Sequence, residues 1–167
     1  MTAMHIRDAV PEDAAAACGV LRRSITELCA ADHHNDPELL AGWLANKTVA
    51  NVLSWIRPGN SLLVAEEADA ILAVGSVTDA GMITLNYVSP MARFRGVSRA
   101  LIQALEDRAR ECGNATCRLT STATAHRFYR ANGYEDDGPP VALGRMTGYP
   151  MAKSLTARRT PNCHGRA

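Results

Sequence analysis

The sequence of 167 residues predicts a mixed α/β fold in which a mainly antiparallel central sheet is flanked by helices. Two observations support this class. Apolar residues make up 47% of the chain and charged residues 21%, which is typical of a folded protein with a sizeable core. The predicted elements run strand, helices, three strands, helix, strand, helix and two strands, an order that favours one mixed sheet. We expect a single domain over residues 1–155 and a polar, flexible tail over 156–167.

The first strand and the first long helix are predicted near the N-terminus. The segment HIRDA, residues 5–9, has the pattern of a short strand. Pro11 suits the first position of a helix because its φ is already fixed near the helical value. The apolar residues between positions 21 and 29 then recur at helical spacing, which indicates a helix to about Ala31. The polar segment DHHND, residues 32–36, interrupts this pattern.

Two short helices are predicted to follow. Asp36 can accept hydrogen bonds from the free amides of a helix that starts at Pro37. Thr48 can cap another helix in the same way, and that helix is expected to end near Pro58.

Three consecutive strands and a helix form the middle of the chain. Residues 61–67, 70–78 and 82–88 are apolar, rich in β-branched side chains and separated by short turns, which indicates antiparallel strands. A helix is expected over 97–112, with Gly113 after its last residue, where a left-handed conformation commonly ends helices.

The C-terminal part is predicted to add three strands and one helix. Residues 115–121 form a strand, and residues 123–132 form an amphipathic helix that Gly133 ends. Residues 141–146 and 149–155 form the last two strands.

Composition limits the possible partners and location. A net charge of +1 excludes binding to nucleic acid or to an anionic membrane through the overall charge of the protein, so any anion site must be local. No apolar run reaches the length of a membrane span, and the N-terminus lacks the apolar stretch of a signal peptide. The five cysteines show no metal-ligand spacing and suit a reducing compartment. We therefore expect a cytoplasmic protein without a metal and without a membrane or nucleic-acid partner.

The segment YVSPMARFRGVSRAL is the strongest functional signal in the chain. Arg93, Arg95 and Arg99 surround Gly96 where a helix begins, although a helix N-terminus already carries partial positive charge. Glycine lets backbone approach a ligand closely, and the first amides of a helix have no intrahelical partner. Such amides form an anion site suited to phosphate, and arginine adds donors with matching geometry. The alternative is that the arginines are merely solvated.

This segment resembles the acetyl-coenzyme A loop of the GCN5-related N-acetyltransferases. In that family the loop follows the pattern Q/R-x-x-G-x-G/A after the fourth strand, and Arg93, Gly96 and Ser98 match it, with Ser98 in place of glycine or alanine. The resemblance implies that the fourth and fifth strands splay apart to admit the cofactor. It also implies a set of residues that bind the pyrophosphate: Arg93, Phe94, Arg95, Gly96, Val97, Ser98 and Arg99.

A second block, TATAHRFYRANGY, resembles the family pattern N-x-x-A-x-x-F/L-Y-x-x-x-G-F. Thr122 stands where the family has asparagine, and its hydroxyl can still bond the pantetheine arm. The resemblance gives Tyr129 the role of donating a proton or hydrogen bond to the departing thiolate, a role that suits a phenol. It also implies that three residues of the fourth strand align the pantetheine: Asn86, Tyr87 and Val88.

The general base and the acceptor are less clearly marked. The fourth strand contains no carboxylate. Glu66 and Glu67 end the second strand, and alternation places one of them on the cleft face, where either could act as the base through water. Glu66 is the candidate, and the alternative is an exposed glutamate at a strand end. The segment with Asp32, His33 and His34 allows four interpretations, namely a solvated turn, an acceptor contact, a base or, least favoured, a metal ligand.

The expected function is therefore transfer of an acetyl group from acetyl-coenzyme A to a primary amine by direct attack. The acceptor would be a small molecule or a peptide, and a homodimer is a further expectation because dimers are common in the family. Two other functions stay open on the sequence alone. One is a non-catalytic acyl-coenzyme A sensor on the same fold, and the other, the least favoured, is a phosphate-directed binder of nucleic acid.

Overall fold

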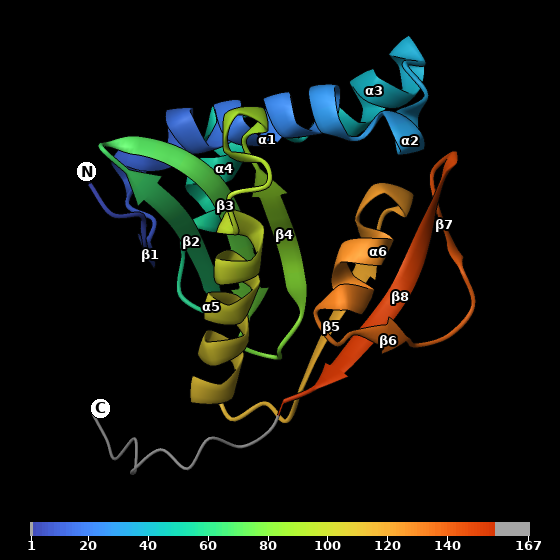
Figure 1. The fold of residues 1–167 in the computed structure, drawn as a ribbon. Helices are drawn as coiled ribbons and strands as arrows, with labels where there is room; N and C mark the ends of the chain where they lie inside the picture. Colours follow the sequence, from blue (N-terminus) through green and yellow to red (C-terminus); the bar gives the residue numbers. More distant parts are fainter. Residues whose placement is uncertain (1, 156–167) are drawn as a thin grey trace.

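The structure is a computed structural model that describes residues 2–155. It confirms the mixed α/β class with antiparallel strand pairing, and the strands divide into two sheets that diverge from each other (Figure 1). The predicted tail, 156–167, lies outside the described residues. The first sheet has the order β1-β2-β3-β4. Its strands are β1 (His5–Asp8), β2 (Asn60–Glu67), β3 (Ala70–Thr78) and β4 (Ile83–Val88).

The second sheet is formed by the C-terminal strands. It has the order β5-β8-β6, and β7 also pairs with β8. Its strands are β5 (Thr116–Ser121), β6 (Glu135–Asp136), β7 (Val141–Leu143) and β8 (Met146–Ser154).

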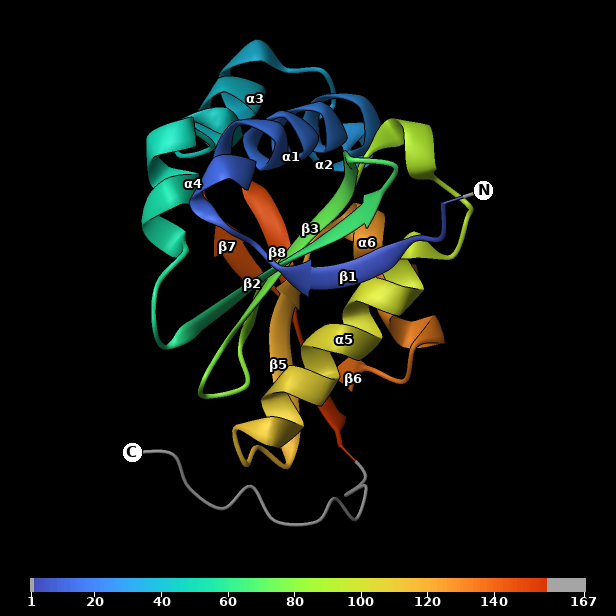
Figure 2. The same cartoon turned by 90° about the vertical axis from the view of Figure 1, so that its left-hand side faces the viewer.

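The helices cover both faces of the first sheet. Figures 1 and 2 show α1, α3 and α4 grouped on one side of this sheet, with α5 on the other side and α6 beside the second sheet. The helical segments are η1 (Pro11–Asp13), α1 (Ala14–Leu28), α2 (Ala30–His33), α3 (Pro37–Leu44), α4 (Val49–Trp55), η2 (Pro90–Ala92), α5 (Val97–Glu111) and α6 (Ala123–Ala131). No helix within residues 2–155 is both long enough and apolar enough to cross a membrane.

Two hydrophobic cores follow from this arrangement. Leu62 and Val64 of β2 belong to the core under α1, whereas Leu63 and Ala65 belong to the core under α5. Successive side chains of a strand point to opposite faces, so both faces of β2 are buried. This explains why the strand has a continuous apolar run rather than an alternating pattern.

Gly75 sets how closely α5 approaches the first sheet. A Cβ atom at this position of β3 would lie 2.8 Å from Leu105 Cδ1 and 3.1 Å from Leu101 Cδ2. Contacts under 3 Å are far inside van der Waals separation, so any larger residue would have to displace these leucine side chains. The N-terminus of α5, which carries the predicted anion site, is positioned by this contact.

Several local predictions are confirmed and others are corrected. Asp36 accepts hydrogen bonds from two amides at the start of α3, and Thr48 accepts one from the amide of Asn51 in α4. The first long helix is instead divided into the 3-10 turn η1, α1 and α2, and the non-helical residue Cys29 separates α1 from α2. Strand β6 was not predicted, and the last two strands are joined by only two residues, 144–145.

Candidate active site

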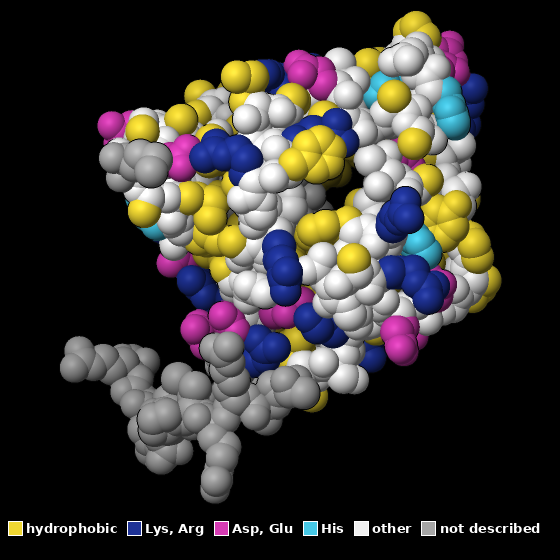
Figure 3. Space-filling model, viewed as in Figure 1, with side chains coloured by type: hydrophobic (Ala, Val, Ile, Leu, Met, Phe, Trp, Pro, Cys, Tyr) yellow, Lys and Arg dark blue, Asp and Glu magenta, His cyan; other side chains and the backbone are white. Residues whose placement is uncertain are grey.

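A cleft opens where β4 and β5 diverge. Within residues 2–155 these strands are joined by one isolated bridge between Met82 and Arg118, where the Arg118 amide donates to the carbonyl of Gly81 at 3.0 Å. Gly81 has a φ of +79°, and a Cβ there would lie 2.7 Å from the carbonyl oxygen of Thr116. Beyond this junction a cavity of about 390 Å³ lies between the two sheets, and Figure 3 shows a hollow in this face.

A bulge in β4 lies at the cleft. Ser76 pairs with Leu85 and Val77 pairs with Ile83, so Thr84 is an extra residue on the β4 side. Its hydroxyl contacts the Ser76 hydroxyl at 2.5 Å. A bulge bends its strand and increases its twist. The bulge therefore helps to turn β4 away from β5.

The N-terminus of α5 faces the cleft with free donors. Gly96 precedes the helix with a φ of +77°, and no side chain caps it. Within residues 2–155, no atom accepts a hydrogen bond from the main-chain amides of Val97, Ser98 and Arg99. All four residues line the cleft. Free amides and the helix dipole together favour a bound anion, as the sequence indicated.

The three arginines of the loop separate into two groups. Arg93 and Arg99 line the cleft, and the Arg93 guanidinium lies 4.6 Å from the centre of the Phe94 ring, which is 93% exposed. Arg95 instead donates to both carboxylate oxygens of Glu67, at 2.7 and 2.9 Å. The side chain of Arg95 therefore lies outside the cleft and anchors the loop to the end of β2.

Tyr129 is buried in the wall of the cleft. It is 6% exposed, and its ring packs edge-on against Phe128 and Tyr134 with ring centres 5.3 and 5.5 Å apart. The side-chain amide of Asn86 donates to the phenol oxygen at 3.2 Å. Burial raises the pKa of Tyr129 to about 12, so the phenol is protonated near neutral pH. Its hydroxyl can therefore donate a hydrogen bond. The contact from Asn86 was not predicted.

Thr122 begins α6 at the edge of the same cleft. Its hydroxyl oxygen accepts a hydrogen bond from the Ala125 amide at 3.3 Å, which caps the helix. The hydroxyl hydrogen is left to donate elsewhere. Apart from Arg95 and Glu66, every predicted site residue lines this one cleft: Asn86, Tyr87, Val88, Arg93, Phe94, Gly96, Val97, Ser98, Arg99, Thr122 and Tyr129.

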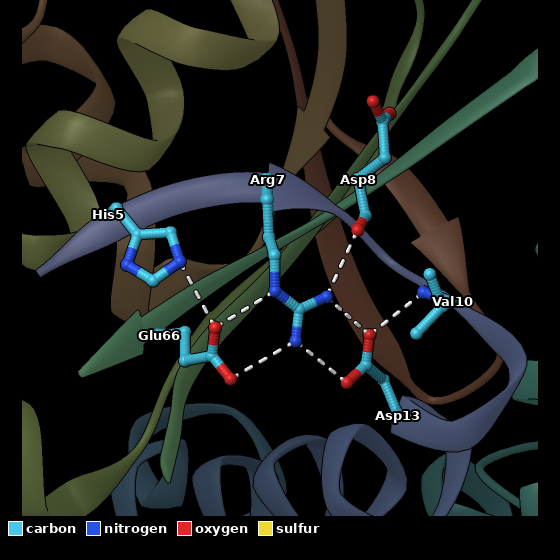
Figure 4. A network of polar contacts seen from close by, with 6 residues as sticks. All are labelled: His5, Arg7, Asp8, Val10, Asp13 and Glu66. Carbon is cyan, nitrogen blue, oxygen red and sulfur yellow. Dashed lines mark hydrogen bonds and ion pairs between the residues drawn. The ribbon is translucent and has the colours of Figure 1, made fainter. Parts of the chain in front are cut away.

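The structure places Glu66 in a different environment. Figure 4 shows its carboxylate beside Arg7, whose Nε and Nη2 atoms donate to it at 2.9 and 3.2 Å, and beside His5 at 3.1 Å. The hydrogen bonds from Arg7 hold the pKa of Glu66 below its usual value, which makes the carboxylate a weaker base. Glu66 does not line the cleft, so we do not retain it as the general base.

The same arginine ties three elements of the fold together. Arg7, on β1, also donates to both carboxylate oxygens of Asp13 at 2.7 and 3.0 Å (Figure 4). Asp13 in turn accepts the Val10 amide at 2.8 Å. The network therefore fixes the start of the first helical region against β1 and β2, and its role is structural.

Asp32 connects the two sides of the cleft. It lies on α2, is 7% exposed, and accepts hydrogen bonds from the amides of Ala123 and Thr124 at 2.7 and 3.1 Å and from the Thr124 hydroxyl. His33 is fully buried, with its Nε2 atom 3.0 Å from the Ile25 carbonyl oxygen. The interpretation of this segment as a solvated turn is therefore wrong for these two residues. Asp32 holds the N-terminus of α6, the helix that carries Tyr129.

Acidic and metal-binding side chains do not gather in the cleft. Of the cleft-lining residues that the structure describes, none is an aspartate or a glutamate. Within residues 2–155, no group of three or more His, Cys, Asp or Glu side chains is placed to hold a metal ion.

Diverging sheets, free amides at a helix N-terminus and a buried phenol meet in this one cleft. The family model described as the acetyltransferase (GNAT) domain matches residues 32–155, well over half of the chain. The chain belongs to this family. No match was found among curated proteins.

Solved structures agree with this assignment. A GCN5-related N-acetyltransferase from Rhodopseudomonas palustris is 26% identical, with a TM-score of 0.81 over 93% of this chain and 98% of that chain. PaiA N-acetyltransferase from Thermoplasma acidophilum, solved with coenzyme A, is 18% identical, with a TM-score of 0.79 over 92% and 99%. The ribosomal-protein-S18-alanine N-acetyltransferase from Escherichia coli is 18% identical, with a TM-score of 0.68 over 96% and 100%. The last two likenesses show the fold alone.

Proposed function

We propose that the protein transfers the acetyl group of acetyl-coenzyme A to a primary amine. The observation that carries this proposal is that free main-chain amides at the start of α5 and the protonated hydroxyl of Tyr129 face one cleft. The first feature suits a diphosphate, and the second suits a developing thiolate. The family assignment and the coenzyme A bound to PaiA support the same ligand.

The residues at the start of α5 fit the pyrophosphate. The amides of Val97, Ser98 and Arg99 supply three donors that the described protein does not otherwise use. Arg93 and Arg99 line the same wall and add positive charge. Ser98 is small enough to keep its own amide accessible, which is consistent with its replacement of the family's glycine or alanine.

The transfer itself needs one nucleophile and one proton donor. The amine nitrogen attacks the thioester carbonyl carbon, the carbon–sulfur bond breaks, and the sulfur takes the electron pair. The nitrogen, which carries a positive charge after the attack, releases its extra proton to water and leaves a neutral amide. Tyr129 donates its hydroxyl proton or a hydrogen bond to this sulfur, and Asn86 holds the phenol oxygen from the other side. A pKa of about 12 makes Tyr129 a donor rather than a base at neutral pH.

The amine must be neutral when it attacks. Since no carboxylate lines the described cleft, we propose that the amine loses its proton to water as it enters. Desolvation in an apolar site lowers the pKa of an amine and favours the neutral form. This route requires no dedicated general base.

Two measurements test the proposal. Calorimetric titration should show acetyl-coenzyme A binding, and thiol release should require an amine. Tyr129→Phe keeps the ring but removes the hydroxyl, so turnover should fall roughly 10²–10⁴-fold with little change in cofactor affinity. Absence of cofactor binding to folded protein would refute the proposal. Tight binding without thiol release against any amine would instead favour the non-catalytic sensor.

A further inference from the structure

The wall of the cleft is charged in one part and neutral in another. Its charged side chains among the described residues are Arg93 and Arg99, both beside the start of α5. The part formed by the C-terminal end of α1 carries Ser24, Leu28 and Cys29, all of them neutral. The part contributed by β4 and α6 is also neutral, with Tyr87, Thr124, Phe128 and Tyr129.

The carboxylates of Asp32, Asp36 and Glu38, which follow α1 in the chain, already have partners. Both oxygens of Asp32 accept hydrogen bonds from the N-terminus of α6. At the start of α3, Arg145 from the β7–β8 turn lies 3.1 Å from Asp36 Oδ2 and 3.3 Å from Glu38 Oε2. An ammonium group placed against the neutral wall would therefore find no free carboxylate among the residues that line it.

From this wall we infer the acceptor class, an inference that rests on the proposed function. The acceptor is a primary monoamine whose remainder is uncharged. Desolvation in the cleft favours the neutral form of its single amine, and this neutral form is the one that attacks. A second ammonium group would stay charged and would lose its hydration without an oppositely charged partner in the neutral wall. Polyamines and multiply charged amino sugars are therefore poor acceptors.

A matched pair of amines tests this inference. Heptylamine and hexamethylenediamine have the same length, and they differ by a terminal methyl group in place of a second ammonium group. With saturating acetyl-coenzyme A, kcat/KM per amine should be at least about tenfold higher for heptylamine, since burying one unpaired charge corresponds to a factor of ten or more. Equal rates, a preference for the diamine, or no turnover of heptylamine would overturn the inference.

A pair of variants tests whether the neutral wall causes the preference. Leu28→Asp places a carboxylate in the cleft, and Leu28→Asn has nearly the same shape without the charge. The aspartate variant should lower the preference for heptylamine by about tenfold relative to the asparagine variant, because an ammonium group gains an opposite charge nearby. An unchanged ratio between the two variants would show that the wall does not select the acceptor.

A measurement of cofactor binding distinguishes failure of this inference from failure of the proposed function. Calorimetry with acetyl-coenzyme A is performed first on the full chain and on both variants. If the cofactor binds and the diamine is the better acceptor, the inference fails while the proposed function stands. If folded protein does not bind the cofactor, the proposed function fails and the inference fails with it.

Discussion

Replacement of Asp32 by asparagine tests the link between α2 and α6. The aspartate accepts two main-chain hydrogen bonds and one from the Thr124 hydroxyl at the start of α6, and it is 7% exposed. Asparagine has one acceptor oxygen in place of two and carries no charge, so at least one buried donor loses its partner. Hydrogen bonds to a charged group contribute about 1.5–3 kcal/mol each, and contributions within one cluster are not additive. We expect Asp32→Asn to lower the free energy of unfolding by about 2–3 kcal/mol.

The assay is urea unfolding followed by circular dichroism, with thermal unfolding beside it. For a chain of this length the loss corresponds to a fall in Tm of roughly 4–12 °C. Glu12→Gln, which neutralises an exposed carboxylate, is the control and should change stability by less than about 0.5 kcal/mol. Because α6 carries Tyr129, kcat should fall more than acetyl-coenzyme A affinity in Asp32→Asn. A loss of stability no larger than that of the control would refute the reasoning.

Three further predictions concern other parts of the fold. Gly75→Ala should cost about 1–3 kcal/mol by overpacking against two leucines of α5, whereas Gly42→Ala, in open space on α3, should not destabilise; urea unfolding compares them. Burial lowers the pKa of Lys47, so the free energy of unfolding should rise with pH between the folded pKa and the value of about 10.4 in the unfolded chain. Lys47→Met should abolish this rise and should increase the free energy of unfolding by about 1 kcal/mol near neutral pH. Hydrogen bonds from Arg7 lower the pKa of Asp13, so the stability that this pair contributes above about pH 4 should be lost as the pH falls through the folded pKa. Arg7→Gln should reduce this loss of stability at acidic pH, which unfolding curves measured between about pH 2 and 6 would show.

Local patterns in the sequence predicted the frame of the cleft. Helix caps at Asp36 and Thr48 are recognisable because a cap and its helix are adjacent in the chain. The loop around Gly96 was recognisable for the same reason, since a strand end, a glycine and a helix start follow one another. The buried strands were predicted from their apolar runs.

The errors concern contacts between distant segments. Glu66 is held by Arg7, which is 59 positions away, and Asp32 caps a helix 91 positions away. Arg95 pairs with Glu67 across 28 positions, so the side chain of Arg95, which was predicted for the site, binds a carboxylate instead of a ligand. A local sequence pattern cannot predict which of two similar side chains will pair with a residue that only folding brings close. The alternation of β2 could not decide the environment of Glu66, because β1 supplies Arg7 at that edge.

The divergence of β4 and β5 leaves a sheet interrupted in the middle of the protein. Strand edges normally complete their hydrogen bonding through a neighbour, and here each edge faces a gap instead. An extended ligand with its own amide groups would act as a temporary substitute for the missing strand. A bound substrate would then link the two sheets. At a ligand concentration of one hundred times Kd, binding would raise the free energy of unfolding by about 2.7 kcal/mol.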